Sequence, residues 1–401
     1  MPRRAEPDRC PGALRVHEAA DGGLARVRVP GGRLSARQVR AVAAAAELGD
    51  GGWELTSRAN LQVRGLAASA VPEFAARLAE SGLLPSPTHE RVRNVIASPH
   101  TGCDELAALD AGAVAVELDE LLCAEPALAE LPGRFLFTVD DGRGDVAGLG
   151  ADVGLVPAGG AVAVLLSGAD EGIRVAAADA ARAAVLAAGE FLVERARQGA
   201  ASWRLAELSE GTGRVAGRLR AALGSAALGS TAPVSAVEPM PTHAGLGARH
   251  RRDGLVCLAL GAPLGRCGAA QVRVLAELGR PLRLTPWRAL LLPDVPETAA
   301  PRLLSELDGA GFLVDAADPL AGVTSCAGSP GCAKSLADVR ADAARVARPG
   351  PRPVHWAGCE RRCGRPAGDA VLVLATGSGY EVGGAPAGEV SAALDAARRA
   401  V

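Results

Sequence analysis

The chain contains an internal repeat, since residues 24–103 and residues 255–332 present the same motifs in the same order. Both copies carry Gln-Val-Arg within a stretch that has apolar residues at helical spacing, and both end on Ser-Pro followed by Gly-Cys. Around these motifs, β-rich segments alternate with helical ones. The repeat therefore predicts two α+β units that pair about a pseudo-two-fold axis.

The repeat and the stretches beyond it predict four domains. In the first copy we expect strands at 24–32 and 55–66, and helices at 38–49 and from about Pro72. In the second copy we expect strands at 255–266 and 282–295, and helices at 271–279 and from about Pro301. The stretches between and after the copies, including an Ala-rich amphipathic run near 175–197, predict two larger α/β lobes. The expected domains are 10–85, 86–235, 236–314 and 315–401, with a Pro-, Ser- and Thr-rich linker at 230–243.

Four cysteines near the end of the chain form two closely spaced pairs, Cys326 with Cys332 and Cys359 with Cys363. Thiolates are soft ligands, and four of them from two short loops suit a [4Fe–4S] cluster. A structural zinc site usually draws on Cys-x-x-Cys knuckles, whereas these pairs enclose five and three residues. The spacing favours a cluster, with zinc and a disulfide pairing as alternatives.

Composition limits the partners and the compartment. A net charge of −2 gives no electrostatic footprint for nucleic acid. The N-terminus lacks the apolar region of a signal peptide, and the apolar runs are too short to cross a bilayer, so we expect no membrane partner and a cytoplasmic protein. In that reducing compartment, most of the cysteines outside the two pairs are expected to be buried small hydrophobes: Cys10, Cys103, Cys123, Cys257 and Cys267.

Several motifs resemble the sulfite and nitrite reductase superfamily over nearly the whole chain: LTSRANLQVRGL, VRNVIASPHTGCD, the two cysteine pairs and the duplication itself. The resemblance implies an α+β fold with two ferredoxin-like half-domains and two α/β lobes that bind a cluster or a tetrapyrrole. Within the superfamily, RCPG at Cys10, AADGGLARVRVPGG and TSRANLQVRGL look most like the precorrin-3B synthase family of the aerobic cobalamin pathway.

This resemblance implies a monooxygenase that hydroxylates precorrin-3A with O2 and closes a lactone before ring contraction. It also implies a [4Fe–4S] cluster, a mononuclear non-haem iron that activates O2, and a separate reductase or ferredoxin as electron donor, with NADH as the ultimate source. The alternative is a sirohaem-dependent sulfite or nitrite reductase that binds sirohaem in the same cleft. A third possibility, of another class, is a non-catalytic protein whose cysteines hold zinc or a structural cluster.

The resemblance also implies roles for single residues. The four paired cysteines become cluster ligands, and Cys363 becomes the ligand nearest the substrate or the second iron. Side chains expected to bind tetrapyrrole carboxylates are Arg58, Arg64, Arg93, Asn94 and Arg134. Where sirohaem reductases carry a lysine-rich strand, this chain has Arg134 and then Leu136, which favours a reaction on the macrocycle. The histidines show no metal-ligand spacing, so the sequence predicts no ligands for the mononuclear iron.

Overall fold

The computed structural model describes residues 10–199, 201–229, 234, 245–366 and 369–399. The chain divides into two compact units. The first unit takes residues 1–14, 28–33 and 82–240, and the second takes 15–27, 34–81 and 241–401. The expected linker at 230–243 lies outside the described residues, except for Val234. Within the described ranges, every helix is too short or too polar to span a bilayer.

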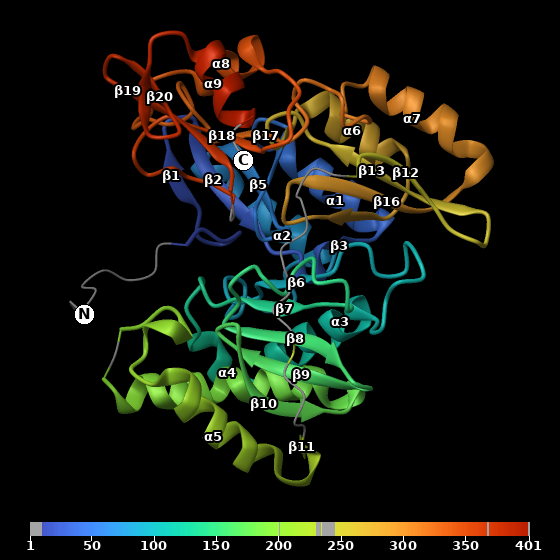
Figure 1. Ribbon diagram of the computed structural model, residues 1–401, viewed down its shortest axis with the longest axis vertical. Helices are drawn as coiled ribbons and strands as arrows, with labels where there is room; N and C mark the ends of the chain where they lie inside the picture. The colour runs from blue at the N-terminus through green and yellow to red at the C-terminus, as the bar shows by residue number, and fades with distance from the viewer. Residues whose placement is uncertain (1–9, 200, 230–233, 235–244, 367–368, 400–401) are drawn as a thin grey trace. The chain divides into compact units, whose positions relative to one another are not determined.

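Residues 24–27 and 34–81 of the first copy and the whole of the second copy lie in the second unit, where the repeat forms two five-stranded sheets (Figure 1). In spatial order, the first sheet is formed by β1 (His17–Ala19), β2 (Gly22–Val27), β5 (Leu61–Leu66), β4 (Trp53–Leu55) and β14 (Arg266–Cys267). The second is formed by β12 (Gly247–His250), β13 (Leu255–Gly261), β16 (Ala289–Pro296), β15 (Leu282–Leu284) and β3 (Arg33–Leu34), the last at the boundary of the two units. Each sheet thus receives its last, very short strand from the other copy.

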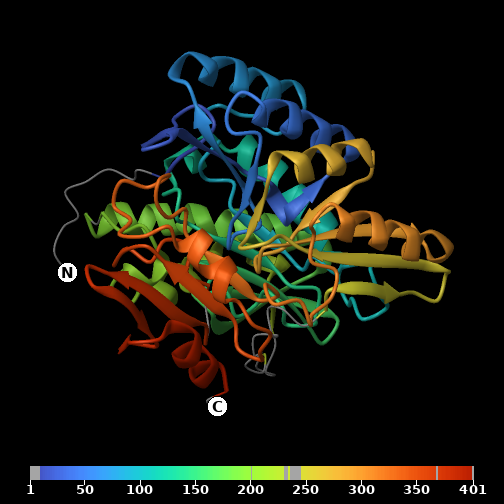
Figure 2. The ribbon, with the colours of Figure 1, turned by 90° about the horizontal axis from the view of Figure 1, so that it is seen from above.

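Each copy adds two helices to its sheet, coloured blue in the first copy and gold to orange in the second (Figure 2). They are α1 (Ala36–Ala46) and α2 (Val71–Glu80), and α6 (Ala269–Glu277) and α7 (Ala300–Gly309). A glutamine side chain accepts a hydrogen bond from the backbone N–H that precedes each first helix, at 3.0 Å from Ser35 to Gln38 and at 2.9 Å from Gly268 to Gln271. This shared N-terminal cap explains why Gln-Val-Arg recurs in both copies.

The structure corrects one feature of the repeat. Segments 55–66 and 282–295 are each expected to be one strand, but each forms two strands joined by a tight turn. In these turns the N–H of Thr56 donates to the Asn60 carbonyl, and that of Thr285 donates to the Ala289 carbonyl, both at 3.0 Å. The fourth turn residue is left-handed in both, with φ 51° at Ala59 and 61° at Arg288. Neither position holds Gly or Asn, so the usual signal of such a turn is missing.

The first unit is built on one six-stranded sheet (Figure 1). Its strands, in spatial order, are β11 (Leu228–Gly229), β10 (Ala169–Val175), β9 (Ala161–Leu166), β8 (Val153–Ala158), β7 (Phe137–Val139) and β6 (Val95–Ala97). Alternate strand residues, such as Val162 and Val164, form one core with the helices α3 (Ala111–Ala124), α4 (Ala180–Arg197) and α5 (Gly211–Leu223). The three helices therefore cover one face of the sheet.

The C-terminal lobe of the second unit has a sheet of the same plan. Its strands, in order, are β17 (Val323–Ser325), β18 (Val354–Ala357), β19 (Val371–Thr376), β20 (Gly379–Val382) and β21 (Ala385–Ala387), and its helices are α8 (Val339–Val346) and α9 (Val390–Arg399). Two parallel pairs precede two antiparallel pairs, as in β6 to β10 of the first unit. The duplication therefore extends to the two lobes, which confirms the expected α+β fold class.

Candidate metal centre

The four paired cysteines lie in two loops at one edge of the C-terminal sheet. Cys326 directly follows β17, and Cys359 comes two residues after β18. Because β17 and β18 are parallel neighbours, their carboxyl ends meet at this edge, where ligands of α/β sheets usually bind. Cys332 and Cys363 lie further along the same two loops. The fold therefore brings the two sequence pairs to one place.

Backbone hydrogen bonds connect the two cysteine loops. The N–H of Cys326 donates to the Trp356 carbonyl at 2.9 Å, and the N–H of Leu336 donates to the Gly358 carbonyl at 2.8 Å. The N–H of Gly358 donates to Cys326 Sγ at 3.2 Å. An amide directed at a thiolate sulfur stabilises its negative charge, which is one way a protein tunes a metal–sulfur centre.

The four thiols also influence one another electrostatically. Burial raises the pKa of Cys363, and the negative charges of Cys326, Cys359 and Cys332 raise it further. Thiolates that repel one another in this way are stabilised by a bound cation or an iron–sulfur cluster. The donor set is therefore chemically suited to a [4Fe–4S] cluster, and four thiolates also suit zinc.

Two buried side chains bind the backbone next to Cys363. His355, on β18, lies with Nε2 3.1 Å from the Cys363 carbonyl oxygen and Nδ1 2.9 Å from the Thr324 hydroxyl. Burial, followed by the charge of Arg288, lowers the pKa of His355 to about 3, so the imidazole is neutral. Since a carbonyl oxygen only accepts, Nε2–H donates to Cys363. Arg288 donates to the carbonyls of Gly364 and Leu55.

Arg64 binds the other cysteine loop. Its guanidinium donates to both carboxylate oxygens of Asp21, at 2.7 and 2.8 Å, and to the Gly331 carbonyl at 2.6 Å. Only 6% of its side chain is exposed. Gly331 directly precedes Cys332, so Arg64 of β5 connects the first half-domain to the cysteine loop by a hydrogen bond. Its expected contact with a tetrapyrrole stays a prediction.

Arg58 lies in the turn between β4 and β5 and is half-buried. Its backbone N–H donates to the Thr56 hydroxyl at 3.3 Å, and it precedes the left-handed residue Ala59. The turn thus fixes the backbone of Arg58 within the unit that carries the four cysteines. The expected contact of its side chain with a tetrapyrrole carboxylate stays a prediction.

The other three expected tetrapyrrole contacts lie in the first unit. Arg93 is buried and donates to both oxygens of Asp119, at 2.7 and 2.6 Å, and to the Leu83 carbonyl at 2.9 Å. Asn94 is also buried, and its Nδ2 donates to the carbonyls of Arg91 and Gly133. Arg134 is exposed, and its guanidinium lies 5.3 Å from the centre of the Trp203 ring. Their roles toward a tetrapyrrole stay predictions.

The loops after β6 and β7 of the first unit correspond to the two cysteine loops, but they contain a polar network that the sequence did not reveal. The Ser98 hydroxyl donates to Asp145 at 2.6 Å, and Arg143 donates to Asp141 at 2.8 Å. Asp140 accepts hydrogen bonds from four backbone N–H groups of its own loop. Most oxygens of these carboxylates are bound by groups of the protein itself, whereas Asp145 Oδ2 is buried without a hydrogen bond.

This network gives the stability of the protein a specific pH dependence. Burial, followed by the charges of Asp140 and Asp141, raises the pKa of Asp145 from 3.8 to about 7, against the Ser98 hydrogen bond and the charge of Arg143, which lower it. The folded state therefore keeps this proton to a higher pH than the unfolded chain, and the resulting stabilisation is lost as the pH rises from about 4 to about 7. We expect the Asp145→Asn protein to lack this decrease in stability between about pH 4 and about pH 7.

Urea unfolding midpoints measured across this pH range test the prediction, and the exposed Glu117→Gln is the control. If the midpoints of wild type and Asp145→Asn fell equally with rising pH, the prediction would be contradicted.

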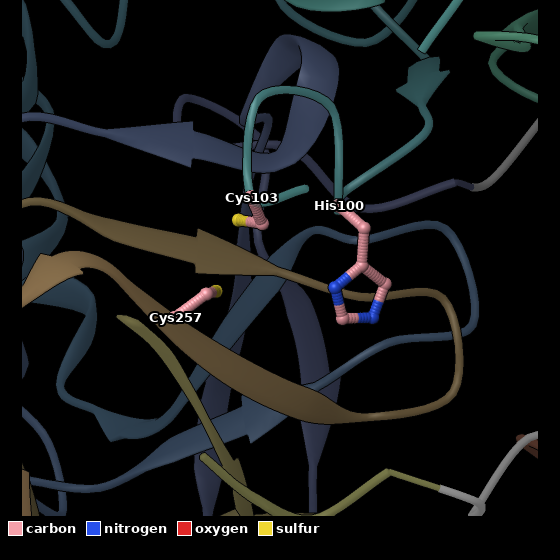
Figure 3. A group of neighbouring side chains, drawn as sticks. All are labelled: His100, Cys103 and Cys257. Atoms are coloured by element: carbon pink, nitrogen blue, oxygen red, sulfur yellow. The ribbon is translucent and has the colours of Figure 1, made fainter. Parts of the chain in front are cut away.

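Figure 3 shows further side chains with metal-ligand atoms. His100 and Cys103 lie in the loop after β6 of the first unit, and Cys257 lies on β13 of the second unit. All three side chains are buried.

Of the cysteines outside the two pairs, Cys103, Cys257 and Cys267 are buried, whereas Cys10 and Cys123 are half-buried. The expectation that most of these cysteines are buried is therefore confirmed.

Comparisons with known proteins agree with this architecture. The model of the nitrite/sulfite reductase ferredoxin-like half domain matches residues 17–81 and 249–310, one match in each copy of the repeat. A precorrin-3B synthase from Sinorhizobium sp is 29% identical over 407 residues, covering 96% of this chain and 85% of that protein. A ferredoxin–nitrite reductase from Synechococcus elongatus is 29% identical over 382 residues, covering 86% of this chain and 74% of that protein.

A solved structure shows the same fold. The NirA protein of Mycobacterium tuberculosis matches with a TM-score of 0.72 at 20% sequence identity, and the match covers 90% of this chain and 74% of that one. Together with the two half-domain matches, it confirms the duplicated architecture expected from the sequence.

Proposed function

We propose that this chain, which matches the nitrite/sulfite reductase ferredoxin-like half domain twice and is similar to a precorrin-3B synthase over nearly its whole length, is a precorrin-3B synthase. The proposed reaction is the O2-dependent hydroxylation of precorrin-3A with lactone formation. One observation carries the proposal: four cysteines converge in a chain that is similar to a precorrin-3B synthase over 96% of its length. We also propose a cytoplasmic location, where thiols stay reduced.

The cysteine loops are proposed to hold a [4Fe–4S] cluster. Such a cluster, when bound, supplies one-electron transfer at the sheet edge where Cys326, Cys332, Cys359 and Cys363 lie. The protein contributes the four thiolates, the Gly358 amide directed at Cys326 Sγ, and the buried side chains that hold the loops. Electrons are proposed to come from a separate reductase or ferredoxin with NADH as the ultimate source.

Arginines are proposed to bind the substrate, because a precorrin carries a fringe of carboxylates and guanidinium groups bind carboxylates bidentately. The proposed contacts are Arg58, Arg64, Arg93, Asn94 and Arg134. Arg64 and Arg93 already bind Asp21 and Asp119, so a substrate carboxylate would have to share these guanidinium groups. We also propose a mononuclear non-haem iron that would activate O2.

A sirohaem-dependent sulfite or nitrite reductase is the second candidate, favoured by the similarity to a ferredoxin–nitrite reductase. Reducing a small anion calls for concentrated positive charge. The segment that carries lysines in such reductases has an apolar Leu136 here, which is buried against Ile96 and Val146. This difference supports a reaction on the macrocycle.

Anaerobic purification with a visible spectrum and counts of iron, sulfide and zinc tests the proposal. We expect iron and sulfide without sirohaem bands, and with precorrin-3A, O2 and an electron donor we expect a product heavier by one oxygen atom. Sirohaem bands with nitrite or sulfite reduction would establish the second candidate. Zinc without iron and sulfide would remove the redox function altogether.

A further inference from the structure

Arg288 stands out because it places a buried positive charge beside a cysteine loop. Only 6% of the residue is exposed, and burial lowers the pKa of its guanidinium to about 10. Its Nε donates to the Leu55 carbonyl at 3.1 Å, and its Nη2 donates to the Gly364 carbonyl, directly after Cys363. A buried charge is costly unless an opposite charge lies nearby.

The described carboxylates do not supply that opposite charge. Glu54 attracts Arg288, but it already forms an ion pair with Arg340 and lies 3.9 Å from Arg64. Asp21 is bound by Arg64. Three arginines therefore share two carboxylates, and one positive charge remains beside the cysteine loops. Four thiolates on a cluster carry the net negative charge that balances it.

The surrounding backbone leaves room for this one side chain. Arg288 itself has a φ of 61°, a left-handed conformation that is unfavourable for a non-glycine residue. A Cβ at Gly265 would lie 2.6 Å from Arg288 Cδ, and a Cβ at Gly364 would lie 3.1 Å from Nη2. Both glycines also have a positive φ of 80°. Glycine adopts such angles without strain, whereas the left-handed Arg288 is strained backbone of the kind found at functional sites.

We propose that Arg288 is a positioning residue for the iron–sulfur cluster: it fixes the peptide after Cys363 and supplies the buried counter-charge of the cluster. The inference rests on the cluster of the proposed function, whatever reaction that cluster serves. A buried cation favours the more negatively charged, reduced state of a cluster, since local charge is one factor that sets its reduction potential. Arg288 therefore raises the midpoint potential.

The test is an EPR-monitored redox titration of the full-length protein, with iron and sulfide counts, for wild type, Arg288→Gln and Arg288→Lys. We expect Arg288→Gln to shift the midpoint to a more negative potential and Arg288→Lys to restore much of the shift. The matched control is Arg266→Gln in the same unit, because Arg266 is already paired with Asp50 at 2.7 Å, and its midpoint is expected to stay unchanged.

Each result decides the inference. A fully loaded Arg288→Gln protein with the wild-type midpoint would overturn it. If Arg288→Gln loses its iron while Arg288→Lys keeps it, the positive charge is needed and the inference stands. If both variants lose iron equally, the charge has no special role and the inference fails. A wild-type protein without iron and sulfide would instead defeat the proposed cluster itself.

Discussion

Replacing Cys332 with serine is expected to remove iron and sulfide from the purified protein and to abolish turnover. A serine hydroxyl is a poor substitute for a thiolate on an iron–sulfur cluster, and Cys332 is one of the four cysteines that interact at this site. The loop itself should keep its course, because the N–H of residue 332 donates to the Gly328 carbonyl at 2.8 Å and the Gly331 carbonyl is bound by Arg64. Metal analysis and the visible spectrum measure the loss.

Cys123→Ser is the matched control for this experiment. Cys123 lies on α3 of the first unit, half-buried and outside the two cysteine pairs. We expect this variant to keep the iron and sulfide content of the wild type. If Cys332→Ser kept full activity and its metal content, the assignment of the four cysteines as cluster ligands would be wrong.

Arg93→Leu is expected to lower the free energy of unfolding by about 3 kcal/mol, since breaking a buried ion pair leaves an uncompensated charge. Only 3% of the Arg93 side chain and 16% of the Asp119 side chain are exposed, so Asp119 would remain largely buried without its partner. The Leu83 carbonyl would lose its donor as well. Urea unfolding monitored by circular dichroism measures the change.

A double-mutant cycle separates this structural role from substrate binding. Adding Asp119→Leu to Arg93→Leu removes the orphaned carboxylate, and we expect it to recover part of the lost stability. An exposed arginine on α4, Arg182→Leu, is the control and should change stability by no more than about 0.5 kcal/mol. A loss equal to that of the control would contradict the structural importance of the ion pair. A rise in KM for precorrin-3A in a stable protein would support the proposed carboxylate contact.

The architecture could be predicted from the sequence because duplication is visible at the level of motifs. The two Gln-Val-Arg segments recur because both copies use the same glutamine cap, and the cysteine pairs meet because they follow parallel neighbouring strands. The turns at 56–60 and 285–289 were not predicted, since the left-handed positions hold Ala59 and Arg288 in place of Gly or Asn.

The surroundings of the site could not be predicted, because burial of a charged group has no local sequence signal. Arg288 is far from Cys363 along the chain, and only the fold brings its side chain to the Gly364 carbonyl. His355 is nearer in sequence but forms no recognisable motif with Cys363, whose carbonyl it binds in the folded protein. In the aligned turns, Arg288 of TPWRAL occupies the place of Ala59 of TSRANL, but four of these six positions differ between the copies.

The exchange of edge strands between the two half-domains has a consequence for how the protein must fold. Residues Arg266 and Cys267 of β14 pair with Glu54 and Trp53 of β4, so the first sheet is finished only when a distant part of the chain has been made. A nascent or truncated half would present an unpaired strand edge, which is a template for aggregation. The two halves are therefore expected to reach the native state as one cooperative unit, with the slow kinetics of long-range strand pairing.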